Sequence, residues 1–454
     1  MGKVVETGSI IAGEPEWLTR ARARYMDYFR TLPVETSQLY VRHYEAPEFN
    51  EEELVDMLAV GWDKGVPEGF REVAETAEQP SAIIVNGRLA HINLPAKLTR
   101  LGVELVDLGE AARKHETLFK NLFSERLQAP TLDKYSALNN ALFSTGIFIN
   151  VPKNVSVDIP IRILWILEGD KSASVGQTII ISGENSHVSV IEEAHGGSAA
   201  VAGLMSHLAE IIQDEGSQAK HAMLQSLPLG KGFLSNRRAQ AGKDSSANLV
   251  GALLGAAVSK VRIDSMLRGD GARCNDLEIV FGDVVQRMDL TSNLHHIGYG
   301  TQGRVLAKGV VKDSAKALFK GVITIGSKAK NTNAYLAEHA MIMSPEARAY
   351  AIPSLEIETD EVKATHSASV SQIDYEQVYY LMSRGIPEDE ARKMIAMGFF
   401  EPVVSMVNLD IVRWGLRSLL EGKWGGAFDE LFEEGHVTAT QLFAGHYKYR
   451  WGKQ

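Results

Sequence analysis

The sequence predicts a mainly β protein in which a parallel β-helix lies between an N-terminal α/β region and a C-terminal helical domain. From about residue 146 onward, helical periods are scarce and short alternating strands dominate as far as residue 374. The alternation then gives way to a helical period. These changes divide the chain into an N-terminal region at 1–145, a β core at 146–374 and helices at 375–454.

Regularly placed turns are the second observation behind the predicted β-helix. Most strands follow a Gly, Asp or Ser turn and a small residue, and the turns recur at roughly 14 to 18 residues or about double that. Repeats of this length without intervening helices are typical of a coil-by-coil β stack. A β-sandwich with irregular turns is the alternative, and it would require an alternating polar face on every strand. The turns begin at Gly169, Gly183, Asp214, Gly242, Gly269, Lys312, Gly326 and Ser344.

The N-terminal region combines helices with one strand pair. A helix is expected over 14–30, because Pro15 and neighbouring glutamates suit a first turn and an apolar face follows. Further helices are expected over 50–60 and 109–126. An alternating strand over 81–93 is expected to turn at Asn86-Gly87, since this dipeptide favours a two-residue hairpin loop.

The C-terminal domain is predicted to contain helices over 375–384, 387–397 and 409–421. Gly398 is expected to end the second helix, as glycine commonly follows a helix C-terminus. Trp414 is expected to face inward in the third helix.

Composition limits the partners and the cellular compartment. A net charge of −10 and a pI near 5.8 argue against nucleic acid or an anionic membrane as the main partner. The single cysteine, Cys274, excludes an intramolecular disulfide and a CxxC metal site. No apolar run resembles a signal peptide or a membrane span, so a cytoplasmic location is expected.

Common catalytic motifs are absent from the sequence. There is no P-loop, no GxGxxG fingerprint, no GxSxG elbow and no HExxH. Carboxylates occur in the predicted strands at Glu192, Glu193, Glu356 and Glu358, but spacing alone selects no acid and base pair among them. A non-catalytic protein is therefore the first expectation.

Three positions in the core carry residues that bind metals in other proteins. His295 and His296 are adjacent on a strand and must point to opposite faces, so they cannot ligate one ion without a bulge. Cys274 follows a turn, and a lone cysteine is usually a small buried side chain. His366 is followed by the small residues Ser367 and Ala368. That setting leaves an imidazole accessible as a ligand for iron, and a surface histidine without a ligand is the equal alternative.

Five segments together resemble the SufB/SufD family, the paired scaffold subunits of the Suf iron–sulfur cluster assembly system. They run in the family's order along nearly the whole chain. The segments are EPEWLTRAR from Glu14, ALNNALFSTGIFINVPKNV from Ala137, KGVVKDSAKALFKG from Lys308, AIPSLEIETDEVKATHSASVSQID from Ala351 and YYLMSRGIPEDEARKMIAMGF from Tyr379.

The resemblance implies a right-handed β-helix core and several partners. An ABC-type ATPase, SufC, would dock on the C-terminal helices and supply the ATPase activity. A second SufB/SufD-type subunit, or a second copy of this chain, would pair through the β-helix. A transient iron–sulfur cluster or iron would form at the subunit interface, from sulfur delivered by a cysteine desulfurase system. Whether a flavin takes part is left open.

The family pattern also suggests site residues. His366 matches the histidine implicated in cluster assembly and is the metal-ligand candidate. Where SufB-like members have a cysteine and a glutamate, this chain has Glu338 and Ser367, so it is identified as SufD-like. Glu338 and Cys274 remain further cluster-site candidates, although Cys274 does not fall on the family's cysteine position. Residues matching the ATPase-binding block are Arg384, Gly385, Ile386, Glu390, Ala391 and Phe399.

Two other functions are compatible with a β-helix. One is a self-sufficient homodimeric cluster scaffold, which would use Cys274 or a ligand from elsewhere. The other is a hydrolase or lyase acting on a polysaccharide or ester along a groove. That function is disfavoured because the core is poor in Trp and Tyr, which would serve as sugar platforms, and because no signal peptide is apparent.

Overall fold

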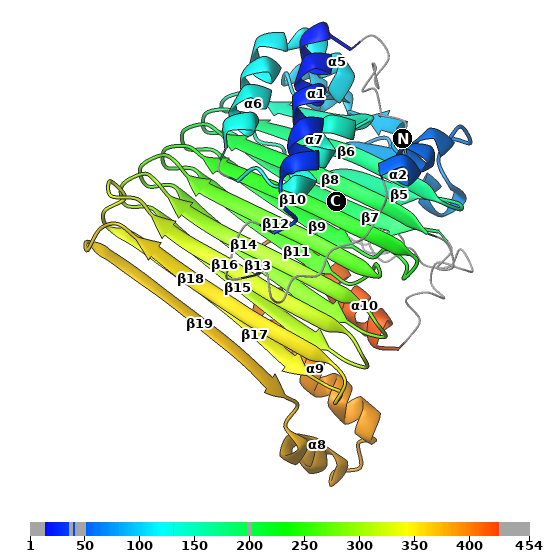
Figure 1. Cartoon of the computed structure of the whole chain (residues 1–454), viewed down its shortest axis with the longest axis vertical. Helices are drawn as coiled ribbons and strands as arrows, with labels where there is room; N and C mark the ends of the chain where they lie inside the picture. The colour runs from blue at the N-terminus through cyan, green and yellow to red at the C-terminus, as the bar shows by residue number, and fades with distance from the viewer. Residues whose placement is uncertain (1–13, 36–39, 41–50, 130, 198–201, 426–454) are drawn as a thin grey trace, which may run out of the picture.

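The computed structural model describes residues 14–35, 40, 51–129, 131–197 and 202–425. Within them the core is a β-solenoid of about eight turns, built from two stacked sheets (Figure 1). Sheet A has the strand order β19-β17-β15-β13-β11-β9-β7-β5-β1-β2, and sheet B has the order β18-β16-β14-β12-β10-β8-β6-β4-β3. Because the chain alternates between the sheets and neighbouring core strands are parallel, the predicted β-helix is confirmed.

The core strands are mostly of similar length. They are β4 (Thr145–Val151), β5 (Ile161–Leu167), β6 (Ser172–Ser182), β7 (His187–Gly196), β8 (Gly203–Gln213), β9 (Gln218–Gln225), β10 (Lys231–Ala241), β11 (Ser246–Leu253), β12 (Val258–Leu267), β13 (Arg273–Gly282), β14 (Arg287–His296), β15 (Gln302–Val311), β16 (Lys316–Ile325), β17 (Thr332–Ile342), β18 (Arg348–Ile357) and β19 (Val362–Gln372).

All eight turns predicted from small residues fall between strands. Other turns carry weaker signals, because residues with a side chain adopt the left-handed conformation there, for example Ala256 at φ 63° and Val284 at φ 51°. Between the sheets, each strand stacks its inward side chains on those of the next turn, and these side chains form one long apolar core.

The N-terminal region closes one end of both sheets. The hairpin of β1 (Ser81–Val85) and β2 (Arg88–Asn93) turns at Asn86 and Gly87, both at positive φ, as predicted. β1 pairs in parallel with β5, and β3 (Glu104–Asp107) pairs antiparallel with β4. The N-terminal strands therefore extend the solenoid.

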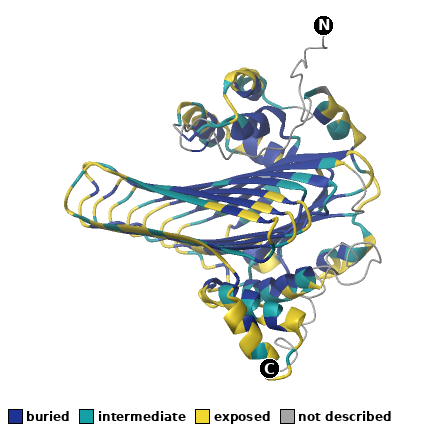
Figure 2. Ribbon diagram, turned by 60° about the horizontal axis from the view of Figure 1, so that its bottom comes forward, coloured by how far each residue is buried: buried dark blue, intermediate teal, exposed yellow. Residues whose placement is uncertain are grey.

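Most helices from the same region cover the outer face of sheet B (Figure 2), whereas the short helical segment 68–75 packs against β1 and β5 of sheet A. The helix predicted over 109–126 is two helices, which break at His115. The helices are α1 (Glu16–Thr31), α2 (Glu51–Val60), η2 (Glu68–Phe70), α3 (Arg71–Glu75), α4 (Ala96–Arg100), α5 (Leu108–Lys114), α6 (Glu116–Gln128) and α7 (Lys134–Leu142).

Three C-terminal helices, α8 (Tyr375–Met382), α9 (Glu388–Val404) and α10 (Asp410–Trp424), follow the last strand. The second and third pack on the outer face of sheet A, where Phe400 and Leu416 join a cluster with Phe281. Two expectations were wrong: α9 continues through Gly398, and Trp414 is 51% exposed. Packing against sheet A explains both differences. It stabilises α9 beyond Gly398, and in α10 it buries the face opposite to the one that carries Trp414.

The other end of the solenoid is open. In the described part of the chain no strand follows β19 in sheet A or β18 in sheet B, so each has one unpaired edge (Figure 1). The described helices include none long and apolar enough to cross a membrane.

Candidate functional site

His366 lies at the open end of the solenoid, on β19. It pairs with Leu336 on β17, whose side chain lies in the interior core. His366 is therefore on the face of sheet A that is interior in earlier turns. In the part of the chain that the structure describes, no further turn covers this face, and the imidazole is exposed. The ring is accessible to an incoming group, as the sequence led us to expect.

Glu338 lies one strand earlier, on the same face of sheet A as His366. Its ladder partner is Ala368, so Glu338 and His366 are diagonal neighbours on adjacent strands. Only 1% of Glu338 is exposed, and its Oε2 atom has no hydrogen-bond partner within the described residues. Burial raises the pKa of Glu338 to about 8, against a hydrogen bond from the backbone of Ile352 and the charge of Lys320. The carboxyl is therefore held in its neutral form near neutral pH.

Cys274 lies apart from these two residues. It is on β13, two strands away from β17, and its side chain belongs to the solenoid core. Burial raises the pKa of the Cys274 thiol to about 12. A buried, protonated thiol is a poor acceptor for sulfur or iron, so the open end brings together His366 and Glu338 without Cys274.

A buried carboxylate cluster near the closed end was missed by the sequence reasoning. Glu192 on β7 accepts hydrogen bonds from Trp165 Nε1 at 2.7 Å and from Thr178 Oγ1 at 2.8 Å. The Nε2 atoms of His207 and His221 lie 2.9 Å and 2.7 Å from its two oxygens. Burial raises the pKa of Glu192, but the two histidines outweigh it and hold the pKa well below its usual range. Glu192 and its four partners lie on five different strands, so spacing in the sequence could not reveal the cluster.

Two further carboxyls face the interior on β13. Glu278 Oε1 lies 2.5 Å from a guanidinium nitrogen of Arg237, and Asp276 accepts a hydrogen bond from Ser292. In the sequence these carboxyls are visible only as polar residues at alternating positions of an otherwise apolar strand. The sequence does not show which face of that strand is buried, so it could not identify them as interior groups.

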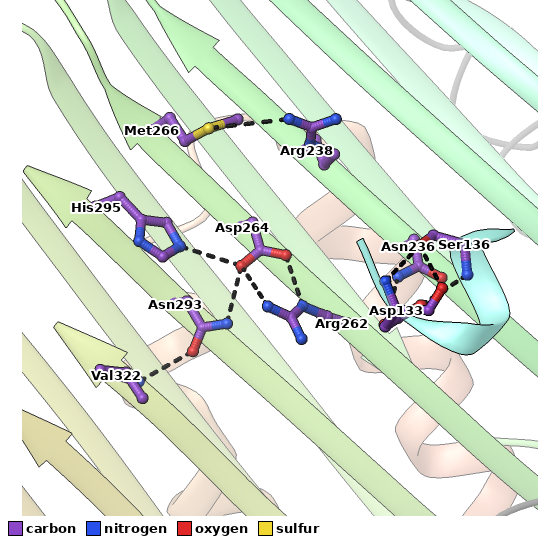
Figure 3. A network of polar contacts seen from close by, with 10 residues as sticks. All are labelled: Asp133, Ser136, Asn236, Arg238, Arg262, Asp264, Met266, Asn293, His295 and Val322. Atoms are coloured by element: carbon purple, nitrogen blue, oxygen red, sulfur yellow. Dashed lines mark hydrogen bonds and ion pairs between the residues drawn. The ribbon is translucent and has the colours of Figure 1, made fainter. Parts of the chain in front are cut away.

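A third network lies on the outer face of sheet B (Figure 3). Asp264 accepts from Arg262 Nε at 2.7 Å and from Asn293 Nδ2 at 2.9 Å, and its Oδ1 lies 3.1 Å from His295 Nε2. Burial opposes ionisation, but Arg262 and His295 hold the pKa of Asp264 well below its usual range. His296 points into the solenoid instead and contacts Thr301, which confirms that the two histidines face opposite ways.

The residues matched to an ATPase-binding block occupy α9 and the turn before it. Arg384, Gly385 and Glu390 are exposed. Ala391, in contrast, is buried in the core beneath the helices. Phe399 is half-buried, and its carbonyl oxygen accepts a hydrogen bond from Lys308 Nζ at 2.9 Å. Ile386 is also half-buried and packs against the same core.

An exposed aromatic surface on α8 adjoins this block. Tyr375, Tyr379 and Tyr380 are 56%, 73% and 55% exposed. The Arg384 guanidinium lies 4.0 Å from the centre of the Tyr380 ring. Three large aromatic side chains left in solvent on one short helix are typical of a protein interface. These tyrosines were not assigned to the ATPase-binding block from the sequence, because the pattern of one short helix does not show which of its side chains are exposed.

Among the described residues, no group of three or more His, Cys, Asp or Glu side chains is arranged to hold a metal ion. His366 and Glu338 therefore supply at most part of a ligand set from this chain.

Comparisons with known proteins agree with the fold and the order of these elements. The SufBD core domain of the SUF system for FeS cluster assembly matches residues 165–399, and the SufBD N-terminal region matches residues 48–163. The chain is 28% identical over 414 residues to the iron–sulfur cluster assembly protein SufD of Bacillus subtilis, which covers 90% of this chain and 94% of that protein. It is also 28% identical over 422 residues to iron–sulfur cluster assembly SufBD family proteins of Staphylococcus saprophyticus and Staphylococcus aureus, covering 90% of this chain and 89% of each relative. With more than half of its length matched by the core domain alone, this chain belongs to the SufBD family of iron–sulfur cluster assembly proteins.

Proposed function

We propose that this chain is a SufD-like, non-catalytic scaffold subunit that pairs through the open end of its solenoid. The observation that carries the proposal is the difference between the two ends. Both sheets end on each side in a strand with one unpaired edge, but at the N-terminal end these strands, β2 and β3, are short, and Leu98 of α4 packs on the interior core. At the other end the longer β18 and β19 have no such cap among the described residues. Soluble proteins normally protect such edges, because free backbone groups attract other strands. A second SufB/SufD-type subunit would protect them here.

Side chains at this end favour burial by a partner. Ile357 on β18 and Val370 on β19 are both 41% exposed, and both lie on the terminal strands. A partner seated there would cover His366 and add ligands to it. Iron or a nascent iron–sulfur cluster would then be cargo at the subunit interface, built from sulfur supplied by a cysteine desulfurase system in the cytoplasm.

The C-terminal helices are the proposed docking surface for a SufC-type ATPase. The exposed tyrosines of α8 and the Arg384 side chain supply the aromatic and cationic anchors that such interfaces use. α8 directly follows β19, so only Ile373 and Asp374 separate it from the strand that carries His366. ATP-driven movement of the ATPases would be transmitted through this connection to the interface.

Reconstitution tests the cluster site. Iron and sulfide are added to the chain co-purified with its Suf partners, and Fe–S absorbance is measured for wild type, His366→Ala and Cys274→Ser. We expect a loss with His366→Ala and none with Cys274→Ser. The matched control is His187→Ala, an exposed histidine at the start of β7. Full reconstitution by His366→Ala would remove this histidine from the site, and loss with Cys274→Ser alone would favour the self-sufficient homodimer.

Point variants, and not a truncation, are needed to test binding of the ATPase. Deleting residues 375–454 would uncover the apolar face of sheet A that α9 and α10 protect, so lost binding could reflect misfolding. Tyr379→Ala with Tyr380→Ala should instead abolish co-purification of the ATPase and leave the fold intact, since both rings are exposed. The control is Tyr28→Ala on α1, which is also exposed, at 40%, but belongs to the N-terminal region and lies outside both proposed partner surfaces. Undiminished ATPase binding by the double variant would contradict the proposed surface.

A further inference from the structure

The outer face of sheet A divides into two halves. In the half nearer the strand C-termini, Leu277 and Leu306 lie beneath the C-terminal helices. The other half is left uncovered by them and carries two ladders of outward-facing side chains. One ladder runs from Gln218 on β9 to Lys363 on β19, and the other runs from Lys220 to Thr365. We call these two ladders together the cationic strip.

The strip contains no carboxylate. Its positions hold the cations Lys220, Arg273, Arg304 and Lys363, and the remainder are Asn, Gln, Ser, Thr and Tyr. A surface without Asp or Glu is unusual in a chain with a net charge of −10. Two carboxylates on the bordering turns pair with lysines outside the strip: Glu215 with Lys243 and Glu361 with Lys330, each at 2.6 Å.

None of the four cations forms an ion pair with another described residue. Arg273, Arg304 and Lys363 are exposed, and no ion pair between described residues includes them. Arg304 lies 5.9 Å from the centre of the Tyr335 ring, while Lys220 Nζ donates to the carbonyl oxygen of Asn408 at 3.2 Å. The two arginines are on neighbouring strands, β13 and β15, and therefore reinforce each other's field.

The dimensions and side-chain chemistry match an extended peptide. Six strands at about 4.8 Å spacing give the strip a length of about 24 Å, which roughly seven extended residues would span. Carboxylates on one side of such a peptide recur about every 7 Å, which lies between the steps of about 5 Å and about 10 Å that separate the strands carrying the cations. Asn275 and Gln302 offer amide donors and acceptors to a peptide backbone. Nucleic acid fits less well, because only four cations are available and the protein's overall charge would repel a polyanion.

We propose that the cationic strip binds an extended acidic segment of a partner protein. The strip reaches β19 but lies on the outer face of sheet A, whereas subunit pairing is assigned to the free edges and interior face at the open end and ATPase docking to α8. The proposal therefore does not depend on subunit pairing or ATPase docking. The acidic segment would lie across the strands, with its carboxylates against the two arginines and Lys363.

Fluorescence anisotropy with a labelled eight-residue peptide of alternating glutamate and threonine tests the proposal on the full chain. We expect binding that weakens several-fold when salt is raised, because exposed charges are screened. Arg273→Glu with Arg304→Glu should weaken binding at least about tenfold, since two exposed ion pairs are lost and reversed. Arg71→Glu with Arg113→Glu is the matched control, because it makes the same charge change at exposed arginines of the N-terminal region.

Circular dichroism checks that each variant is folded, and Arg273→Gln with Arg304→Gln replaces the reversal if that variant unfolds. A glutamine version of the peptide should bind at least about tenfold more weakly than the acidic one. Equal affinity of wild type and strip variants, or no binding of the acidic peptide, would overturn the proposal. Tighter binding of a thymidine oligomer through the same arginines would also overturn it and assign the strip to nucleic acid.

Discussion

Individual residues in this solenoid face one of three environments: the interior between the sheets, a sheet face covered by helices, or solvent. Glu338 shows how strongly the environment acts, because its carboxyl is enclosed in the last complete turn and forms no ion pair with another described residue. His366, on the next strand and the same face, is left in solvent. One turn of the stack thus separates a neutral carboxyl from an accessible imidazole.

Glu338 should make stability depend on pH. Its pKa is raised from 4.5 to about 8, so the folded chain keeps a proton that the unfolded chain has already lost in this range. The free energy of unfolding should therefore fall as pH rises through the interval, by up to about 1.4 kcal/mol per pH unit. Glu338→Gln, which cannot ionise, should lose this component. Urea unfolding of both proteins between about pH 5 and pH 8 checks it. Parallel pH profiles for the two proteins would mean that Glu338 is ionised in the fold.

Glycines in the turns should differ in importance according to their surroundings. A Cβ on Gly269 would lie 2.0 Å from the backbone nitrogen of Lys243 in the preceding turn. Gly300 has a φ of 65° but open space around it. We expect Gly269→Ala to cost about 3 kcal/mol through backbone displacement and Gly300→Ala about 1 kcal/mol through its strained φ. Denaturant midpoints measure both, and a larger loss at Gly300 would show that conformation outweighs close approach.

At the scale of elements, the helices are held by the sheet faces they cover. In α10, Leu416 is fully buried against the outer face of sheet A, whereas Trp414 points to solvent. Leu416→Ala should therefore destabilise the chain by about 2–5 kcal/mol, and Trp414→Ala by less than about 1 kcal/mol. The urea unfolding midpoints of the two variants, and their rates of protease cleavage near residue 420, measure this difference in stability. A greater effect at Trp414 would mean that the inward face of α10 is assigned wrongly.

Elements whose signals are local were predictable from the sequence. The hairpin at Asn86-Gly87 and the glycine-marked turns fall where small residues and positive φ require them. Turns such as the one at Val284 were missed, because a β-branched residue there adopts the left-handed conformation only under tertiary constraint. Gly398 stays inside α9 and Trp414 faces outward for the same reason, since packing on the sheet outweighs local preference.

Of the candidate site, only the residues that match the family pattern could be predicted from the sequence. His366 occupies the accessible position expected from its small neighbours. The burial of Glu338, the separation of Cys274 and the cluster around Glu192 all depend on which strands stack together. Such stacking brings together residues about thirty positions apart in the chain, so it cannot be predicted from any single segment of the sequence.

At the scale of the whole molecule, the solenoid is asymmetric. At its N-terminal end short antiparallel strands and α4 cap the interior core, while at its C-terminal end the described residues leave two long strand edges, half-exposed apolar side chains and His366 uncovered. The helix that follows β19 carries the most exposed aromatic residues on the described surface. Both proposed partner surfaces therefore meet at one end of the molecule, where movement of one partner reaches the other.

The most direct measurement is the composition of the complex formed by charge-substituted variants of the open end. Ile357→Asp with Val370→Asp places a carboxylate on each terminal strand, and Val285→Asp is the control because Val285 is 62% exposed in the turn between β13 and β14. Native mass spectrometry of the chain co-expressed with its Suf partners reports which subunits remain bound. We expect the double variant to lose the second SufB/SufD-type subunit while it stays folded and keeps the ATPase, and the control to keep both. Retention of that subunit by the double variant would contradict pairing through the open end.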